Sequence, residues 1–208
     1  DSSVSNPLWN AHLNNYNKGQ EFGFTNNFII EWFATHDFRL RAKFGLTKSD
    51  DTSDVRLSPL HSQFDDVSDT EKGLYTHTQT KGLVYEGDLA ATFGRLFADK
   101  HMVNAVAGFN FSSTKRENYG FSANGFTDDQ FDSPSFANSY PNGESPDYSR
   151  TEKRAASFYI NGGYAYDNRY LLDFNYRSDG ASMFGTDNRF RNTWSVGLGW
   201  NIHNEKFL

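Results

Sequence analysis

The chain contains no cysteine and only two methionines among its 208 residues. The absence of cysteine excludes a disulfide framework and a structural zinc site built on thiolates. The chain also lacks a run of Lys and Arg, and its formal net charge is −6, so nucleic acid is not expected as a partner. No apolar run approaches the ~20 residues that a transmembrane helix requires. Only β-strands could therefore carry this chain across a membrane.

Aromatic residues are abundant in a chain that is otherwise hydrophilic. They make up 17% of the sequence, with 20 Phe and 11 Tyr, while the mean hydropathy is −0.73. A soluble β-sandwich shows this combination mildly. A transmembrane β-barrel shows it strongly, because aromatic girdles mark both membrane interfaces while the lumen and loops are polar. Composition alone leaves both architectures open.

The segment RYLLDFNYRSDGASMFG (169–185) alternates between apolar and polar residues. Such a period of two predicts a β-strand with one face in an apolar medium and the other in water. Six further segments show the same alternation, at 26–33, 37–47, 82–93, 102–111, 157–166 and 192–202. The pattern predicts an all-β fold, an antiparallel meander of about seven strands with the ~9–11 residues that cross a bilayer obliquely.

The expected connections alternate in length. Short polar turns at 35–37, 98–101 and 166–169 are separated by long polar connections, which we place at 48–80, 113–154 and 178–191. This is the loop pattern of an outer-membrane barrel, which has tight periplasmic turns and extended outer loops. The sequence therefore predicts that residues 113–154 form a long extracellular loop.

The alternation also assigns side chains to faces. We expect one set to face lipid: Leu172, Phe174, Tyr176, Trp194, Val196, Leu198 and Trp200. We expect another set to face the lumen: Arg39, Arg41, Asp88, Asn110, Asp173, Asn175 and Arg177. Successive cations on one strand face would be costly in a packed core but not beside water, so these residues favour the barrel.

Catalytic and metal sites have little support in the sequence. The six histidines are scattered without a ligand-like spacing, and no hydrolase, metalloprotease or phosphate-loop motif occurs, so no enzyme activity, cofactor or metal is expected. Two acidic clusters, Asp50, Asp51, Asp54 and Asp128, Asp129, Asp132, lack the Gly and closing Glu of a calcium loop. Solvated loop charge explains them better.

The 113–154 segment carries an unusual number of aromatic residues for polar loop sequence: Tyr119, Phe121, Phe126, Phe131, Phe136, Tyr140 and Tyr148. Two interpretations remain open. These rings could stack on a sugar substrate or a partner protein. Alternatively, they pack the long loop onto itself, as ordered long loops do.

One long stretch, RYLLDFNYRSDGASMFGTDNRFRNTWSVGLGWNIHNEKFL (169–208), resembles the barrel of SusC-like TonB-dependent outer-membrane transporters. That family carries a similar YLLD-NYR-DG-FG element followed by a Trp-bearing strand that ends in GW. Residues 5–19, 97–111 and 125–143 also look like parts of the same barrel. The resemblance extends over nearly the whole chain.

The resemblance implies a barrel of about 22 strands with a plug in its lumen, located in the outer membrane of a Gram-negative bacterium. Such transporters import large nutrients, commonly oligosaccharides or peptides. They use a SusD-like surface lipoprotein as a lid and are energised by the TonB complex. The sequence shows no plug, TonB-contacting box, signal peptide or terminal strand ending in Phe, so we expect residues 1–208 to be one internal piece of the barrel domain. A soluble all-β glycan-binding module is the alternative, and it predicts a second sheet packed over the apolar face.

Overall fold

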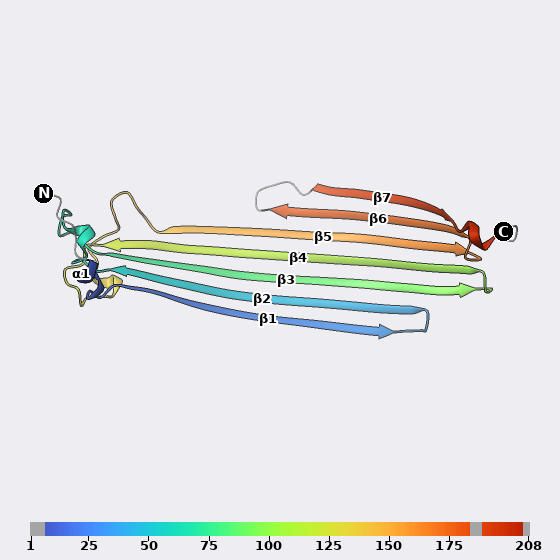
Figure 1. Cartoon of the computed structure of the whole chain (residues 1–208), viewed down its shortest axis with the longest axis horizontal. Helices are drawn as coiled ribbons and strands as arrows, with labels where there is room; N and C mark the ends of the chain where they lie inside the picture. The colour runs from blue at the N-terminus through green and yellow to red at the C-terminus, as the bar shows by residue number, and fades with distance from the viewer. Residues whose placement is uncertain (1–6, 184–188, 206–208) are drawn as a thin grey trace. The chain divides into compact units, whose positions relative to one another are not determined.

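The computed structural model describes residues 7–183 and 189–205, which form one seven-stranded sheet with the order β1 to β7 (Figure 1). The strands are β1 (Tyr16–Phe33), β2 (Phe38–Leu57), β3 (Leu74–Phe97), β4 (His101–Asn124), β5 (Asp147–Tyr166), β6 (Tyr170–Met183) and β7 (Arg189–Trp200). Helical structure among the described residues is limited to α1 (Pro7–Ala11) and the single 3-10 turns η1 (Ser62–Phe64), η2 (Pro134–Phe136) and η3 (Ile202–Asn204). The expected all-β meander of seven strands is confirmed.

Two of the short turns have a backbone geometry that fits a tight hairpin. Ala98 and Asp99 join β3 to β4, and Asp167 and Asn168 join β5 to β6, all four with φ between 48° and 57°. Each turn is closed by a backbone hydrogen bond, in which Lys100 donates to Phe97 and Arg169 donates to Tyr166. Two central residues with positive φ match the right-handed twist of the flanking strands. These turns therefore fix the register of their hairpins.

The strands are longer than the sequence pattern indicates. β2 continues to Leu57, β3 begins at Leu74, β4 continues to Asn124 and β5 begins at Asp147. The expected connections 48–80 and 113–154 are therefore wrong at their boundaries, and the true loops are 58–73 and 125–146. The third expected connection, 178–191, is mostly strand, and its residues 184–188 lie outside the described part of the chain. Apolar alternation is lost where both faces of a strand are polar, although backbone pairing continues.

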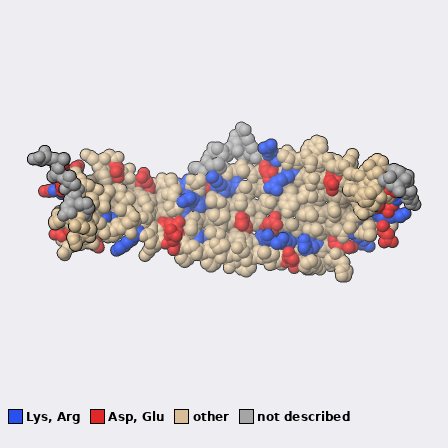
Figure 2. All heavy atoms as spheres, viewed as in Figure 1, with Lys and Arg blue, Asp and Glu red and all other residues tan. Residues whose placement is uncertain are grey.

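Contacts divide the chain into two units, which we describe separately. The loop unit comprises residues 1–23, 48–82 and 116–150 and contains the two long loops. The wall unit comprises residues 24–47, 83–115 and 151–208 and contains the short turns. Acidic and basic side chains are interspersed on the face seen in Figure 2, where no basic patch gathers.

The buried core of the described residues lies mainly in the loop unit. Phe126 is 1% exposed, and Arg56 and Ser58 are fully buried. Gly125 takes a φ of +78°, and its N–H and that of Phe126 both donate to the carbonyl of Lys72. This turn at the end of β4 inserts the Phe126 ring beneath the 58–73 loop, where it lies against Gly73.

We expect Gly125→Ala to destabilise the loop unit by more than about 2 kcal/mol. A Cβ at Gly125 would collide with the carbonyl of Thr70 and the side chain of Asn138, in addition to the cost of a positive φ. Gly143→Ala is the matched control, because Gly143 has a φ of +80° but no neighbour within 4 Å of such a Cβ. It should cost about 1 kcal/mol. Hydrogen exchange of the loop-unit amides measures both, and equal losses would contradict the packing argument.

Candidate transmembrane wall and loop cluster

Strands β6 and β7 place every residue that we expected to face lipid on one side of the sheet. The register pairs Leu172 with Leu198, Phe174 with Val196 and Tyr176 with Trp194, and Trp200 lies opposite Tyr170. Paired residues share a face and alternate with the opposite face along each strand. Tyr176 is half-buried, and the others are exposed, with Trp194 at 72% and Leu198 at 85%. Among the described residues no second sheet covers them.

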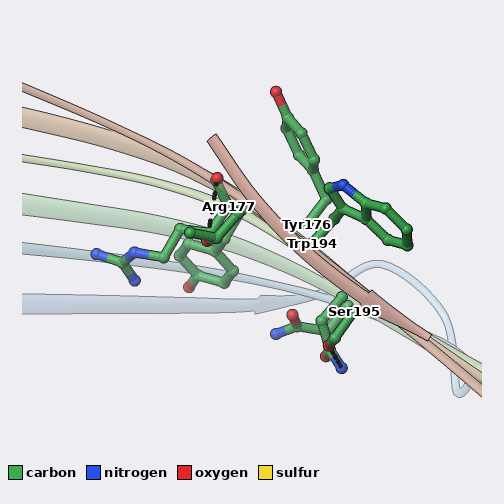
Figure 3. A pocket seen from close by; sticks show the side chains of 8 residues that line it. Tyr176, Arg177, Trp194 and Ser195 are labelled. Carbon is green, nitrogen blue, oxygen red and sulfur yellow. Dashed lines mark hydrogen bonds between the residues drawn. The ribbon is translucent and has the colours of Figure 1, made fainter. Parts of the chain in front are cut away.

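The opposite face of β5, β6 and β7 is polar. Asn175 donates to Ser195 Oγ at 3.2 Å, and Arg177 Nε donates to Asp179 at 2.8 Å. A shallow hollow on this face is lined by residues that include Tyr159, Asn161 and Thr193. Figure 3 shows Arg177 and Ser195 on one side of the ribbon, with Tyr176 and Trp194 on the other.

Strands β2, β3 and β4 continue the polar face within the wall unit. Lys43, Asp88 and Asn110 line a single hollow together with Ala155, which lies on the polar face of β5 two residues from Ser157. Ser157 Oγ accepts a hydrogen bond from Arg177.

On β2, Arg41 pairs with Glu31 at 3.2 Å. Alternation places Arg39 and Arg41 on the Lys43 side, so all the residues expected in the lumen share one face. That this face lines a lumen is still a prediction.

A cluster of aromatic side chains with polar groups lies beside the short turns, on the apolar face. His101 Nδ1 lies 2.7 Å from the Tyr164 hydroxyl, and the His101 and Tyr166 rings are 5.0 Å apart. Glu205 accepts hydrogen bonds from the Tyr170 hydroxyl at 2.8 Å and from Trp200 Nε1 at 3.1 Å. Rings that are apolar at one end and hydrogen-bonded at the other are typical of a membrane interface. Sequence reasoning missed this cluster, although His, Tyr and Trp recur at the turn-side ends of four strands, β4 to β7.

In the loop unit, the fully buried Arg56 joins segments that are far apart in sequence. Its guanidinium donates to the carbonyl oxygens of Asn14 at 2.5 Å, Asp129 at 2.9 Å and Phe131 at 3.1 Å. The same group lies 5.7 Å from the centre of the Phe126 ring. The backbone N–H of Asn14 donates in turn to the Asp129 carboxylate. Arg56 thus connects the N-terminal segment to the 125–146 loop.

A second polar cluster lies on β2 and β3 of the loop unit. The Tyr75 hydroxyl donates to Asp54 Oδ1 at 2.6 Å, and His77 Nδ1 lies 2.7 Å from the same oxygen. Hydrogen bonding from His77, then from Tyr75, lowers the pKa of Asp54. Burial, followed by the bond to Asp54, raises the pKa of Tyr75. The Phe121 ring covers both Tyr75 and His77.

These bonds predict a pH dependence. Because the folded pKa of Asp54 lies below the unfolded value of about 3.9, the stabilisation is complete above that value and is lost as the pH falls through the folded pKa. We expect Asp54→Asn to weaken protection of the loop-unit amides by about 1 kcal/mol at neutral pH. The difference from the wild type should vanish at strongly acidic pH. Hydrogen exchange measured across that range checks this, and a difference that does not change with pH would contradict it.

The seven loop aromatics do not form one set. Tyr119 and Phe121 lie within β4 and Tyr148 lies within β5, so they are strand residues. Two exposed pairs are present: Tyr119 with Tyr148, at a ring-centre distance of 4.9 Å, and Phe131 with Phe136, stacked at 4.7 Å. Tyr140 is 49% exposed. Phe126 is a buried core residue, so for this residue the expectation of a substrate or partner contact is wrong.

Other kinds of site are limited in the described residues. No helix in 7–183 or 189–205 is long and apolar enough to cross a membrane. Within the same ranges no group of three or more His, Cys, Asp or Glu side chains is arranged to hold a metal ion. In particular, Asp54 is hydrogen-bonded to Tyr75 and His77, and Asp129 to Asn14.

Comparison with known proteins gives relatives at the level of sequence and of fold. No family model matches the chain. Aligned over its whole length, the chain is 26% identical to a segment that makes up 21% of TonB-dependent receptor P26 of Formosa agariphila. A second alignment covers 28% of the chain and 6% of TonB-dependent receptor SusC of Bacteroides thetaiotaomicron, with 41% identity. A solved structure of the RagAB peptide transporter matches 93% of the chain with a TM-score of 0.77 and 19% identity, and the match covers 21% of that structure's chain.

The fold is that of part of a large antiparallel β-barrel, with one apolar face and one polar face. The sequence matches relate the chain to the SusC-like TonB-dependent receptors, in agreement with the motif in residues 169–208. The relatives named above are receptors or transporters. The chain spans about a fifth of the length of receptor P26, which it matches over its own whole length, and about a fifth of the matched RagAB chain.

Proposed function

We propose that this chain is part of the barrel wall of a TonB-dependent transporter, which imports large nutrients such as oligosaccharides or peptides across the outer membrane of a Gram-negative bacterium. The two-faced wall unit is the observation that carries the proposal. One face of β6 and β7 exposes a contiguous set of large apolar side chains, and the other face carries charged and amide groups. Such an apolar surface is unfavourable in water, whereas hydrocarbon on one side and a wet lumen on the other suit both faces.

The length of the apolar face supports a membrane span. The Tyr166–Tyr170 pair lies at the short turn, and the Ala156–Gly180 pair lies about ten residues further along the same strands, which is the length that a tilted strand needs to cross the bilayer. Tyr85, Phe111 and Phe190 line a hollow beside this second pair. Aromatic side chains thus mark both ends of a span, as they do in membrane barrels.

The sheet also has two edge strands, and in a closed barrel each of them must pair with a further strand. β1 and β7 are its first and last strands, and each has one neighbour in the described sheet. In hydrocarbon every backbone group must be hydrogen-bonded, so a wall of this kind requires a closed barrel. We infer that the rest of the barrel, with a plug and its contact with the TonB complex, belongs to the longer protein.

The loop unit fits the outer mouth of the barrel. Short turns are periplasmic and long loops are extracellular in such proteins, so the 125–146 loop would face the substrate and a SusD-like lipoprotein lid. The stacked Phe131–Phe136 pair, with Phe131 at 45% and Phe136 at 51% exposure, is the best candidate contact. One matched structure is described as a peptide transporter, and stacked rings also suit sugars, so both substrate classes are candidates. A soluble glycan-binding module is not favoured, because it would cover the apolar face.

The topology can be tested in whole cells that produce the full receptor. A protease site inserted between Asn142 and Gly143 should be cut by external protease, because this loop would lie outside the cell. The same insertion between Asp99 and Lys100 should be protected until the outer membrane is opened. Uptake of labelled oligosaccharides and peptides, with and without a functional TonB complex, then tests transport. Cleavage of both sites in intact cells, or secretion of the receptor as a soluble protein, would overturn the proposal.

A further inference from the structure

The apolar face of the wall unit contains a hollow bounded by Tyr85, Phe111 and Phe190. The Gly180–Phe190 pair belongs to the same face as Tyr176 and Trp194, because all four lie at even positions of one antiparallel register. The floor of the hollow consists of small side chains, which include Ser113, Ala156, Gly180 and Ser182. A hollow with a floor of small, uncharged side chains and with aromatic walls suits a hydrocarbon chain.

Two glycines allow the aromatic walls to lie flat on the sheet. The Phe111 ring lies over Gly87, and the Phe190 ring lies over Gly180, where a Cβ at either glycine would collide with the ring. Each ring therefore covers the neighbouring strand instead of projecting away from the sheet. The space between the rings remains above the small residues of β4, β5 and β6.

The rim of this hollow carries a cation. Arg154 also lines it and pairs across the sheet with Ser182. The Arg154 side chain is 65% exposed, and its Nε donates to Glu152 Oε1 at 2.8 Å. Arg154 donates to Glu152 through Nε and Nη2. An arginine has five N–H donors in a planar fork, so these two bonds use only some of them. Such a fork suits bidentate recognition of phosphate.

We propose that this hollow binds one lipid that bears a phosphate, with an acyl chain between the aromatic rings and the phosphate on Arg154. The depth of the site agrees with this occupant. The hollow lies about ten residues along the strands from the aromatic cluster at the turns, and this is the span of the hydrocarbon layer. Arg154 lies two residues beyond Ala156, at the level of the headgroups. The site rests on the proposed function, because it requires the apolar face to contact lipid.

The test uses the full receptor in nanodiscs of phosphatidylcholine that contain a small fraction of phosphatidic acid, whose phosphate is exposed. Native mass spectrometry after mild release counts the phosphatidic acid that the receptor retains. We expect Arg154→Gln to lower retention about fivefold or more. Arg191→Gln is the matched control, because Arg191 lies opposite Asp179 on the polar face of the same unit, and it should leave retention unchanged. Ala156→Phe should also lower retention, because the new ring fills the hollow without removing a charge.

The possible failures are distinguishable. If Arg154→Gln and Arg191→Gln lower the retention of phosphatidic acid equally, the effect is a general one of charge, and the proposed site is overturned. Full retention in Ala156→Phe would overturn the role of the hollow. A wild-type receptor that inserts and imports substrate but retains no phosphatidic acid would overturn the lipid site and leave the transport proposal standing. A receptor that does not enter the nanodisc would overturn both.

Discussion

Replacing Val196 by Arg in the full receptor will destabilise the folded barrel by about 2–4 kcal/mol. Val196 pairs with Phe174 on the apolar face and is 54% exposed. It lies near the middle of the proposed span, between the aromatic cluster at the short turns and the hollow lined by aromatic rings. An arginine at this depth must either enter hydrocarbon or draw water into it, and both are unfavourable. The free energy of unfolding in lipid vesicles, measured by denaturant titration of Trp fluorescence, gives the value.

Ser195→Arg is the matched control for this result. Ser195 is the neighbouring residue in β7, and its side chain lies on the polar face, where it accepts a hydrogen bond from Asn175. We expect its replacement to cost less than about 1 kcal/mol, since the new cation stays in water. A third variant, Leu198→Arg, lies closer to the turns, so its cost should fall below that of Val196→Arg. Equal costs for Val196→Arg and Ser195→Arg would show that the two faces do not meet different media.

The strands and their faces could be predicted from sequence wherever one face is apolar. In the 169–177 segment, Leu172 and Phe174 alternate with Asp173 and Asn175, and the register pairs each set with residues of its own face in β7. The pattern ends where the second face also becomes polar. Residues 48–57, KSDDTSDVRL, continue β2 although they read as a loop. Backbone pairing holds that extension, and pairing leaves no periodic signature in the side chains.

The loop unit could not be predicted, because its core depends on contacts between distant residues. Phe126 is preceded by Gly125 and followed by polar sequence, so it reads like any other loop aromatic. Its burial depends on the φ of +78° at Gly125 and on the two backbone bonds to Lys72. The motif resemblance identified residues 125–143 as part of the family's barrel, but it did not distinguish the buried ring from the exposed ones.

Arg56 is the residue whose removal should affect the loop unit most. It has no signal in the sequence, where it stands alone between Val55 and Leu57. In the structure it is 0% exposed and donates to the carbonyls of Asn14, Asp129 and Phe131. Arg56→Met keeps much of the side-chain volume but leaves three carbonyl groups without their donor. We expect the local free energy of opening to fall by about 3–5 kcal/mol.

The measurement is hydrogen exchange of the amides that this arrangement protects, above all the N–H of Asn14, which donates to the Asp129 carboxylate, and that of Ser58, which donates to Asn15. Arg95→Met is the control, because Arg95 is 55% exposed and pairs with Asp37 at 3.4 Å, so its loss should cost less than about 1 kcal/mol. Arg56→Lys should be nearly as damaging as Arg56→Met, since a single ammonium group cannot reproduce the planar fork. Unchanged protection in Arg56→Met would show that other contacts hold the 125–146 loop. Loss of protection at Asn14, with the wall unit intact, would establish that this one buried side chain holds the N-terminal segment against the 125–146 loop.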